Sequence, residues 1–172
     1  MILTRDHIVR EINDGRIVVD PFTAEDHIGP ASIDLHLGNI FRRFKKGART
    51  IVAREETDVE KITDTIELAG DDAITLKPGE FALGVTWEKI TLPDDIAGWI
   101  EGRSRFARIG IGVHVTSGFI QPGTSNHQVL EIVNSGAKPV KLAPGLRICQ
   151  IVFERCEGRA EYRGEYRDQI GP

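Results

Sequence analysis

Short apolar segments separated by recurring turn signals constrain the fold of this chain more than any other feature of its sequence. The turn signals are Gly29-Pro30, Pro78-Gly79, Pro93-Asp94-Asp95, Pro122-Gly123 and Pro144-Gly145. Between them lie apolar runs at residues 81–85, 96–100, 111–115, 129–133 and 148–153. Their lengths and β-branched content favour strands over helices. Many short strands without alternating helices predict a mainly β fold, as a sandwich, jelly roll or barrel.

Three other segments have a different character. Thr4 is placed to cap a helix from Arg5 to about Asn13, and Gly15 is placed to end it. The polar stretch 45–72 predicts a long excursion with some strand character. The tail 154–172 is rich in Arg, Glu, Gly and Tyr and has no apolar period. A tail of this composition is usually mobile, and the alternative is a lid that orders over a ligand.

Length and composition favour one soluble domain over residues 1–172. The formal net charge of −4 gives no indication of a nucleic-acid partner. No apolar run approaches membrane-spanning length, and the first residues lack a signal-peptide pattern, so we expect a cytoplasmic protein without a membrane partner. Cys149 and Cys156 do not form a disulfide framework. Cys149 lies in an apolar run and is expected to be a buried thiol.

Three arginines and a serine form the first informative group, between Gly102 and Arg108. Ser104 is a suitable helix N-cap. A short helical turn would place Arg108 on the same face as Ser104. Free N–H groups at a helix start also suit phosphate. The alternative is a capped surface turn with solvated arginines, which this segment taken alone favours.

Glu131 is the second informative residue. In a strand, Val129, Glu131 and Val133 share one face, so the carboxylate lies among β-branched apolar side chains. Such a carboxylate must be paired, protonated or at an exposed edge. Desolvation would raise its pKa, which suits a group that shuttles protons. The alternative is a glutamate on the solvated face of an edge strand, the more common situation for a single Glu in a strand.

The segment from His114 to Gly123 runs from a strand into a glycine-containing bend. Such a bend exposes backbone N–H and C=O groups that can read a base edge. His114 is a candidate catalytic group, although a structurally hydrogen-bonded histidine is favoured. The other histidines lack metal-ligand spacing, and the chain lacks the H-x-E and P-C-x-x-C patterns of zinc-dependent deaminases. We therefore expect no zinc site.

An ordered set of motifs extends over nearly the whole chain. In chain order these motifs are Pro30 to Gly38, Gly102-Arg103-Ser104, Ala107-Arg108, His114-Val115-Thr116, Ile120 to Gly123, Leu130-Glu131, Asn134-Ser135-Gly136, Pro144-Gly145, Arg147 to Gln150, and the tail residues Tyr162, Tyr166 and Gln169. In this order and spacing they are similar to the motifs of the dCTP deaminase family, within the dCTP deaminase and dUTPase superfamily.

The resemblance implies a distorted β-barrel or jelly-roll-like fold of the dUTPase type with a short N-terminal helix. It also implies a homotrimer whose active sites lie between neighbouring subunits. The implied activity is hydrolytic deamination of dCTP to dUTP and ammonia. Glu131 would deprotonate the water that attacks C4 of cytosine, while Ser104 and Arg108 would position the water and the carboxylate, an adjacent arginine keeping it ionised. Mg²⁺ would bind with the triphosphate and not to protein side chains, and it would take no part in the deamination.

A nucleotide-binding set drawn from several segments is implied as well. Its members are Arg103, Ser104, Arg105, Phe106, Ala107, Arg108, Thr116, Ser117, Gln121, Val129, Leu130, Glu131, Gln150, Tyr162, Glu165 and Gln169. The backbone near Thr116 and Ser117 would read the pyrimidine, and Arg103 would approach the triphosphate. The implied ligand is dCTP, with dUTP and dTTP as further candidates.

Four positions depart from the family pattern. Arg105 stands where a second serine is usual, Gln121 where Asp is usual, Glu165 where a phosphate-contacting Lys is usual, and Ser117 where Ala is usual. These changes leave the deamination residues in place and bear on nucleotide affinity.

The departures also set the order of the functional alternatives. The segment Ser117-Gly118-Phe119 is similar to bifunctional members that take dCTP through to dUMP, but Gln121 cannot act as a base for the pyrophosphatase step. We therefore place a dCTP deaminase first, the bifunctional enzyme second and a pure dUTPase third. A nucleotide-binding sensor of weak activity on the same trimeric scaffold is the hypothesis from another class.

Overall fold

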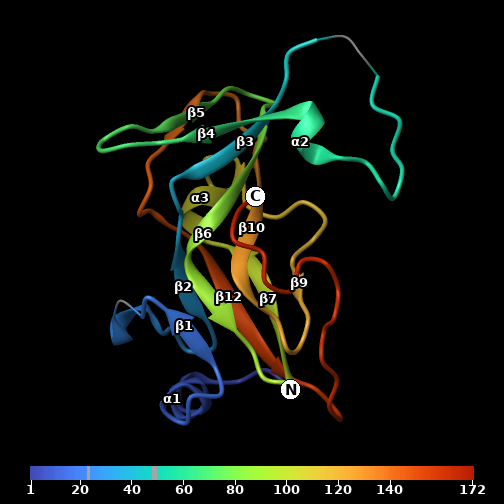
Figure 1. Cartoon of the computed structure of the whole chain (residues 1–172). Helices are drawn as coiled ribbons and strands as arrows, with labels where there is room; N and C mark the ends of the chain where they lie inside the picture. The colour runs from blue at the N-terminus through green and yellow to red at the C-terminus, as the bar shows by residue number, and fades with distance from the viewer. Residues whose placement is uncertain (23, 48–49) are drawn as a thin grey trace.

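A computed structural model describes residues 1–22, 24–47 and 50–172 of the chain (Figure 1). The helices are short and few within these ranges, and strands dominate. In chain order the elements are α1 (Arg5–Asn13), β1 (Val18–Asp20), the 3-10 helix η1 (Glu25–His27), β2 (Ile33–His36), β3 (Ile40–Phe44), α2 (Val59–Ile62), β4 (Thr63–Glu67), β5 (Ile74–Leu76), β6 (Phe81–Thr91), β7 (Ile96–Gly102), α3 (Ser104–Ala107), β8 (Ile111–Gly112), β9 (Phe119–Ile120), β10 (Ser125–Asn134), β11 (Val140–Leu142) and β12 (Arg147–Arg155).

The described strands form antiparallel sheets. One sheet has the strand order β4-β3-β6-β10-β8, with β1 also pairing with β6. A second has the order β2-β12-β7-β9, and β11 pairs with β5 in a small third sheet. The apolar faces of the two larger sheets contribute to a single core. This arrangement confirms the predicted mainly β fold of distorted-barrel or jelly-roll-like type.

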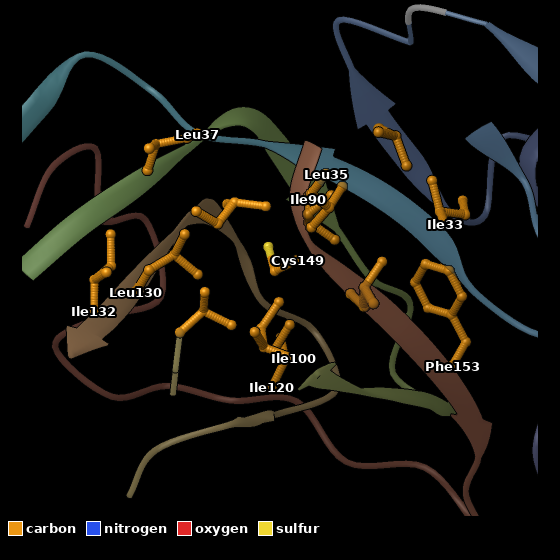
Figure 2. Packing of buried hydrophobic residues seen from close by; sticks show 14 of the residues in the cluster. Ile33, Leu35, Leu37, Ile90, Ile100, Ile120, Leu130, Ile132, Cys149 and Phe153 are labelled. Atoms are coloured by element: carbon orange, nitrogen blue, oxygen red, sulfur yellow. The ribbon is translucent and has the colours of Figure 1, made fainter. Parts of the chain in front are cut away.

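The core explains why β10 can present a carboxylate to the outside. Side chains alternate between buried and half-buried along this strand. Leu130 and Ile132 are fully buried, and Figure 2 shows them pointing to the same interior as Ile100 and Cys149 of the other sheet. The side chains between them, including Glu131, therefore lie on the opposite face. Cys149 is a free, fully buried cysteine, which confirms the prediction, and its burial raises the pKa of the thiol.

The predicted helix is confirmed as α1, with Thr4 at its N-cap position. The Thr4 side chain makes no cap hydrogen bond and instead lies 3.3 Å from Nδ1 of His7. Gly15 follows the C-cap with φ +67°, a left-handed conformation that glycine adopts without steric cost. Within the described chain, no helix is long and apolar enough to cross a membrane.

The predicted strand at 111–115 is wrong beyond Gly112. Strand β8 contains only Ile111–Gly112, which pair with the end of β10. The chain then leaves the sheet, and the backbone N–H groups of residues 115–117 bind the Glu131 carboxylate instead of a neighbouring strand. The Glu131 side chain of β10 thus takes the place of a neighbouring strand as the hydrogen-bond acceptor for this loop.

The polar excursion contains β4, as its strand character predicted, and also the short helix α2, which was not predicted. Residues 48–49 lie outside the described part. It returns to the sheet through β4, which pairs with β3. Arg42 of β3 forms an ion pair with Glu60 of α2, with a distance of 3.0 Å. The excursion is therefore tied to the edge of the sheet that β4 and β3 form.

Candidate active site

A groove of about 1150 Å³ lies on the outer face of β10. Its walls come from β10, from the chain around β9, from the polar excursion and from the tail. The residues of the predicted nucleotide-binding set that line it are Ser117, Gln121, Val129, Glu131, Tyr162, Glu165 and Gln169. The fold therefore brings together residues that are far apart in the sequence.

Glu131 is held in this groove by four hydrogen bonds from residues 115–117. Its Oε2 accepts from the N–H groups of Val115 and Thr116, each at 2.6 Å, and from the N–H of Ser117 at 3.2 Å. Its Oε1 accepts from the Thr116 hydroxyl at 2.7 Å. Of the three states expected for this residue, the carboxylate is the paired one, and its partners are neutral donors.

The direction of the predicted pKa shift of Glu131 is wrong. Burial acts to raise this pKa, but the N–H and hydroxyl of Thr116 and the N–H groups of Val115 and Ser117 outweigh it and lower the pKa from 4.5 to about 2. Hydrogen bonds to the charged form stabilise it, and a carboxylate with several backbone donors is an extreme case. Within one chain, the loop and not an arginine keeps Glu131 ionised.

The cationic corner, defined as residues 103–108, follows β7 and contains α3 (Ser104–Ala107). Ser104 was predicted as the N-cap, but Arg103 occupies that position and Ser104 is the first helical residue. This leaves the Ser104 hydroxyl exposed and available for other partners. The N–H of Arg108 donates to the Ser104 carbonyl at 3.1 Å, so Arg108 lies one turn on from Ser104, as the sequence predicted.

The inner side of the cationic corner is fixed by polar contacts. Arg103 forms an ion pair with Asp34 at 2.9 Å and donates to the Arg147 carbonyl at 2.7 Å. Gln150 accepts from the Ser32 hydroxyl at 2.7 Å and donates to the Gly102 carbonyl at 3.2 Å. Phe106 packs against the core. Arg105 and Arg108, by contrast, are exposed and have no side-chain partner among the described residues.

The three predicted catalytic residues are not together in one chain. Glu131 lines the groove, whereas Arg108 lines a separate cavity of about 740 Å³ between α3 and the β10–β11 connection. No hydrogen bond or ion pair joins Glu131 to Ser104 or Arg108 in the part of the chain that the structure describes. Leu130 is also removed from any ligand, because its side chain is fully buried and only its backbone remains available.

The tail forms one wall of the groove and is packed along the start of β10. The N–H groups of Ser125 and His127 donate to the carbonyls of Arg167 and Gln169 at 3.0 and 3.1 Å. The N–H of Tyr162 donates to the Pro122 carbonyl at 2.9 Å. The tail is therefore packed against the start of β10 in this structure, and a role as a lid over a ligand stays a prediction.

His114 differs from its predicted structural role. A hydrogen-bonded histidine was favoured, but Nδ1 of His114 is buried without a hydrogen-bond partner, alone among the described side chains. The ring instead packs against Gly118, where an added Cβ would lie 3.2 Å from Cδ2. The imidazole therefore supports the bend by packing.

Sequence reasoning missed the acidic wall that the excursion contributes. Besides Glu131 and Glu165, the acidic residues lining the groove are Glu55, Glu56, Asp58, Glu60 and Asp168, and Arg42 is the basic side chain among the described lining residues. The only sequence signal was the charged composition of residues 45–72. No group of three or more His, Cys, Asp or Glu side chains in residues 1–22, 24–47 and 50–172 is arranged to hold a metal ion.

Comparison with known proteins agrees with the resemblance seen in the motifs. A family model described as dCTP deaminase-like matches residues 2–156. A protein of Methanosphaera stadtmanae named "dCTP deaminase, dUMP-forming" is 43% identical over 179 residues, covering 99% of this chain and 91% of that protein. A protein of Rhodospirillum rubrum named "dCTP deaminase" is 39% identical over 184 residues, covering 100% of this chain and 94% of that protein.

A solved structure shares the fold. The crystal structure of 2'-deoxycytidine 5'-triphosphate deaminase from Agrobacterium tumefaciens superposes with a TM-score of 0.69 at 22% identity. The match covers 91% of this chain and 48% of that one, so the chain spans about half the length of that protein. With a matching family model over most of its length and full-length relatives well above 30% identity, the chain belongs to the dCTP deaminase-like family.

Proposed function

We propose that this chain catalyses the hydrolytic deamination of dCTP to dUTP and ammonia, with Glu131 as the group that activates water. The observation that carries the proposal is an ionised carboxylate in a groove, fixed by the backbone and hydroxyl donors of residues 115–117. The names of the full-length relatives support the same substrate.

The chemistry needs one group that moves protons in turn. Attack of water forms the O–C4 bond, and the proton that water loses passes to Glu131. Glu131 returns this proton to the ring nitrogen N3, and the remaining hydroxyl proton is then transferred to the exocyclic amine as the C4–N bond breaks. The products are the C4 carbonyl of dUTP and ammonia. A single positioned carboxylate can carry each of these transfers.

A homotrimer with shared sites is part of the proposal. The groove carries several acids and one described arginine, so a triphosphate placed there meets repulsion. The cationic corner has the opposite character, with Arg105 and Arg108 exposed and without side-chain partners among the residues described. A second copy that brings its corner to this groove would supply the missing cations and unite Ser104, Arg108 and Glu131. Closed symmetric assemblies are the usual form of such pairing.

We also propose that Mg²⁺ enters with the nucleotide. The ion would be carried by the phosphates of the nucleotide and not by protein side chains. When bound, it would neutralise phosphate charge in a groove that Glu165 and Asp168 line.

A second candidate is the dUMP-forming reaction named for the Methanosphaera stadtmanae relative. It would add cleavage between the α- and β-phosphates of dUTP, releasing pyrophosphate. Gln121 lines the groove where the family usually has Asp, and an amide cannot act as the base for that step. We therefore keep simple deamination as the main proposal and test both reactions together.

The test is incubation of the purified protein with dCTP and, separately, dUTP, each with Mg²⁺, followed by separation of products. Ammonia and dUTP from dCTP, with dUTP left intact, are expected. Release of pyrophosphate and dUMP would replace this proposal by the bifunctional one, and tight binding without turnover would replace it by a sensor. EDTA should weaken nucleotide binding, and stoichiometric zinc in the purified protein would contradict the mechanism.

A further inference from the structure

We infer that Thr116 is a positioning residue for the deamination, whose hydroxyl sets the proton affinity of Glu131 and reverses its hydrogen bond when Glu131 takes a proton. The inference rests on the proposed function, in which Glu131 is the base. It concerns a side chain that reaches the carboxylate from the bend after β8, outside the element that carries Glu131.

The two oxygens of Glu131 are not equivalent. Oε2 accepts three backbone N–H groups, from Val115, Thr116 and Ser117, which exceeds the two lone pairs of that oxygen. Oε1 accepts only the Thr116 hydroxyl and keeps one lone pair. A water held for attack on the cytosine must therefore hydrogen-bond to Oε1. Oε1 is then the oxygen that takes the proton from this water.

The four donors differ in what they can do after that proton arrives. A backbone N–H can only donate, so it stabilises the carboxylate and opposes its protonation. A hydroxyl can donate to the carboxylate and then rotate to accept from the carboxylic acid. Thr116 is thus the one partner of Glu131 that can bond Oε1 in both protonation states. Without this hydroxyl, Oε1 would be left with one fewer partner before and after the transfer.

No other charged group takes over this role. The remaining titratable side chains that line the groove are Arg42, Glu55, Glu56, Asp58, Glu60, Tyr162, Glu165, Tyr166 and Asp168. None of them forms a hydrogen bond or ion pair with Glu131 within the described ranges. His114 precedes the loop and makes no bond to Glu131 through its buried Nδ1. The charge state of Glu131 therefore depends on the loop.

The first test measures Glu131 directly, by carbon-13 NMR titration of its carboxyl in the nucleotide-free protein. Thr116→Val should raise the pKa of Glu131 by about one unit, because a hydrogen bond to a charged group is lost. Thr116→Ser keeps the hydroxyl and should titrate like the wild type. Thr75→Val, on an exposed position of β5, is the matched control and should leave Glu131 unchanged. Equal titration of Thr116→Val and wild type would overturn the inference.

The second test is kinetic. Thr116→Val should lower kcat for dCTP by about tenfold to a hundredfold with little change in KM, and Thr116→Ser should recover most of the loss. A loss confined to KM, or no recovery with Ser, would show that Thr116 only shapes the loop. The wild type and Glu131→Gln separate the two levels of proposal. A wild type that does not deaminate dCTP refutes the proposed function, and a Glu131→Gln variant that keeps turnover removes Glu131 as the base. An inactive Glu131→Gln with an unaffected Thr116→Val refutes this inference alone.

Discussion

The groove and the cationic corner differ in how many of their charged side chains find partners within the same chain. Glu131 in the groove has four donors at 2.6 to 3.2 Å, all from residues 115–117. In the cationic corner Arg103 is paired with Asp34, but Arg105 and Arg108 project from the surface without described side-chain partners. The carboxylate of the groove is already held in place by its own chain, whereas the exposed arginines of the cationic corner are free to bind an anion.

This difference indicates how the work of the site is divided. Buried or half-buried charges need fixed partners, and the groove provides them within the chain. Exposed arginines cost little while solvated and can bind phosphate or carboxylate when these arrive. The separation of the acids of the groove from the exposed arginines of the cationic corner is the charge distribution that the proposed shared site requires.

The substitution with the largest expected effect is at Glu131, in the groove. Glu131→Gln should lower deamination by about a thousandfold or more, since an amide cannot accept the proton from water. The assembly should remain intact, because the amide oxygen can still accept part of the hydrogen bonds. Product analysis and light scattering check both statements. Glu67→Gln on an exposed position of β4 should keep normal turnover. Near-normal activity of Glu131→Gln would remove Glu131 from its role.

The second prediction tests whether the two regions meet between subunits. Glu131→Gln and Arg108→Ala should each be inactive alone. If a site takes Glu131 from one copy and Arg108 from another, random mixing of the two variants should restore up to about a quarter of wild-type activity. Activity after co-expression or joint refolding measures this. Absence of recovery in verified mixed oligomers would place the whole site within one chain and reject the shared-site model.

More of the fold than of the site could be predicted from the sequence, for a physical reason. The alternation around Glu131 follows from the strand period alone, so its place on the face opposite Leu130 and Ile132 could be predicted, and β10 confirms it. The partners of that carboxylate depend on where the bend after β8 leads, which no local period encodes. For this reason the strand at 111–115 was too long and the pKa of Glu131 was expected to move upward, whereas it is lowered to about 2.

The cationic corner shows the same limit on a smaller scale. Its arginines and its helical turn could be read from the segment, and α3 is present. The exact cap could not, because whether Ser104 or Arg103 ends the extended backbone is set by how β7 leaves its sheet. The pairing of Arg103 with Asp34 of β2 joins residues far apart in the chain and was likewise beyond local patterns.

The smallest expected effect is the pH dependence that Glu131 contributes to the stability of the protein. The pKa of Glu131 in the folded protein is about 2, below the 4.5 of an unperturbed glutamate. Its contribution to the free energy of unfolding is therefore fully present above pH 4.5 and is lost as the pH falls towards 2. The stability gap between wild type and Glu131→Gln should accordingly shrink across this window in urea titrations.

Ser104→Ala in the cationic corner is the matched control, because it removes a polar group without removing an acid. Its stability relative to wild type should stay constant between pH 7 and 3. Other acids with lowered pKa values, such as Glu11 beside Arg16 and Arg155, are present in all three proteins, so their effect cancels in the differences. A gap for Glu131→Gln that does not change with pH would mean that the loop does not hold the carboxylate in its ionised form.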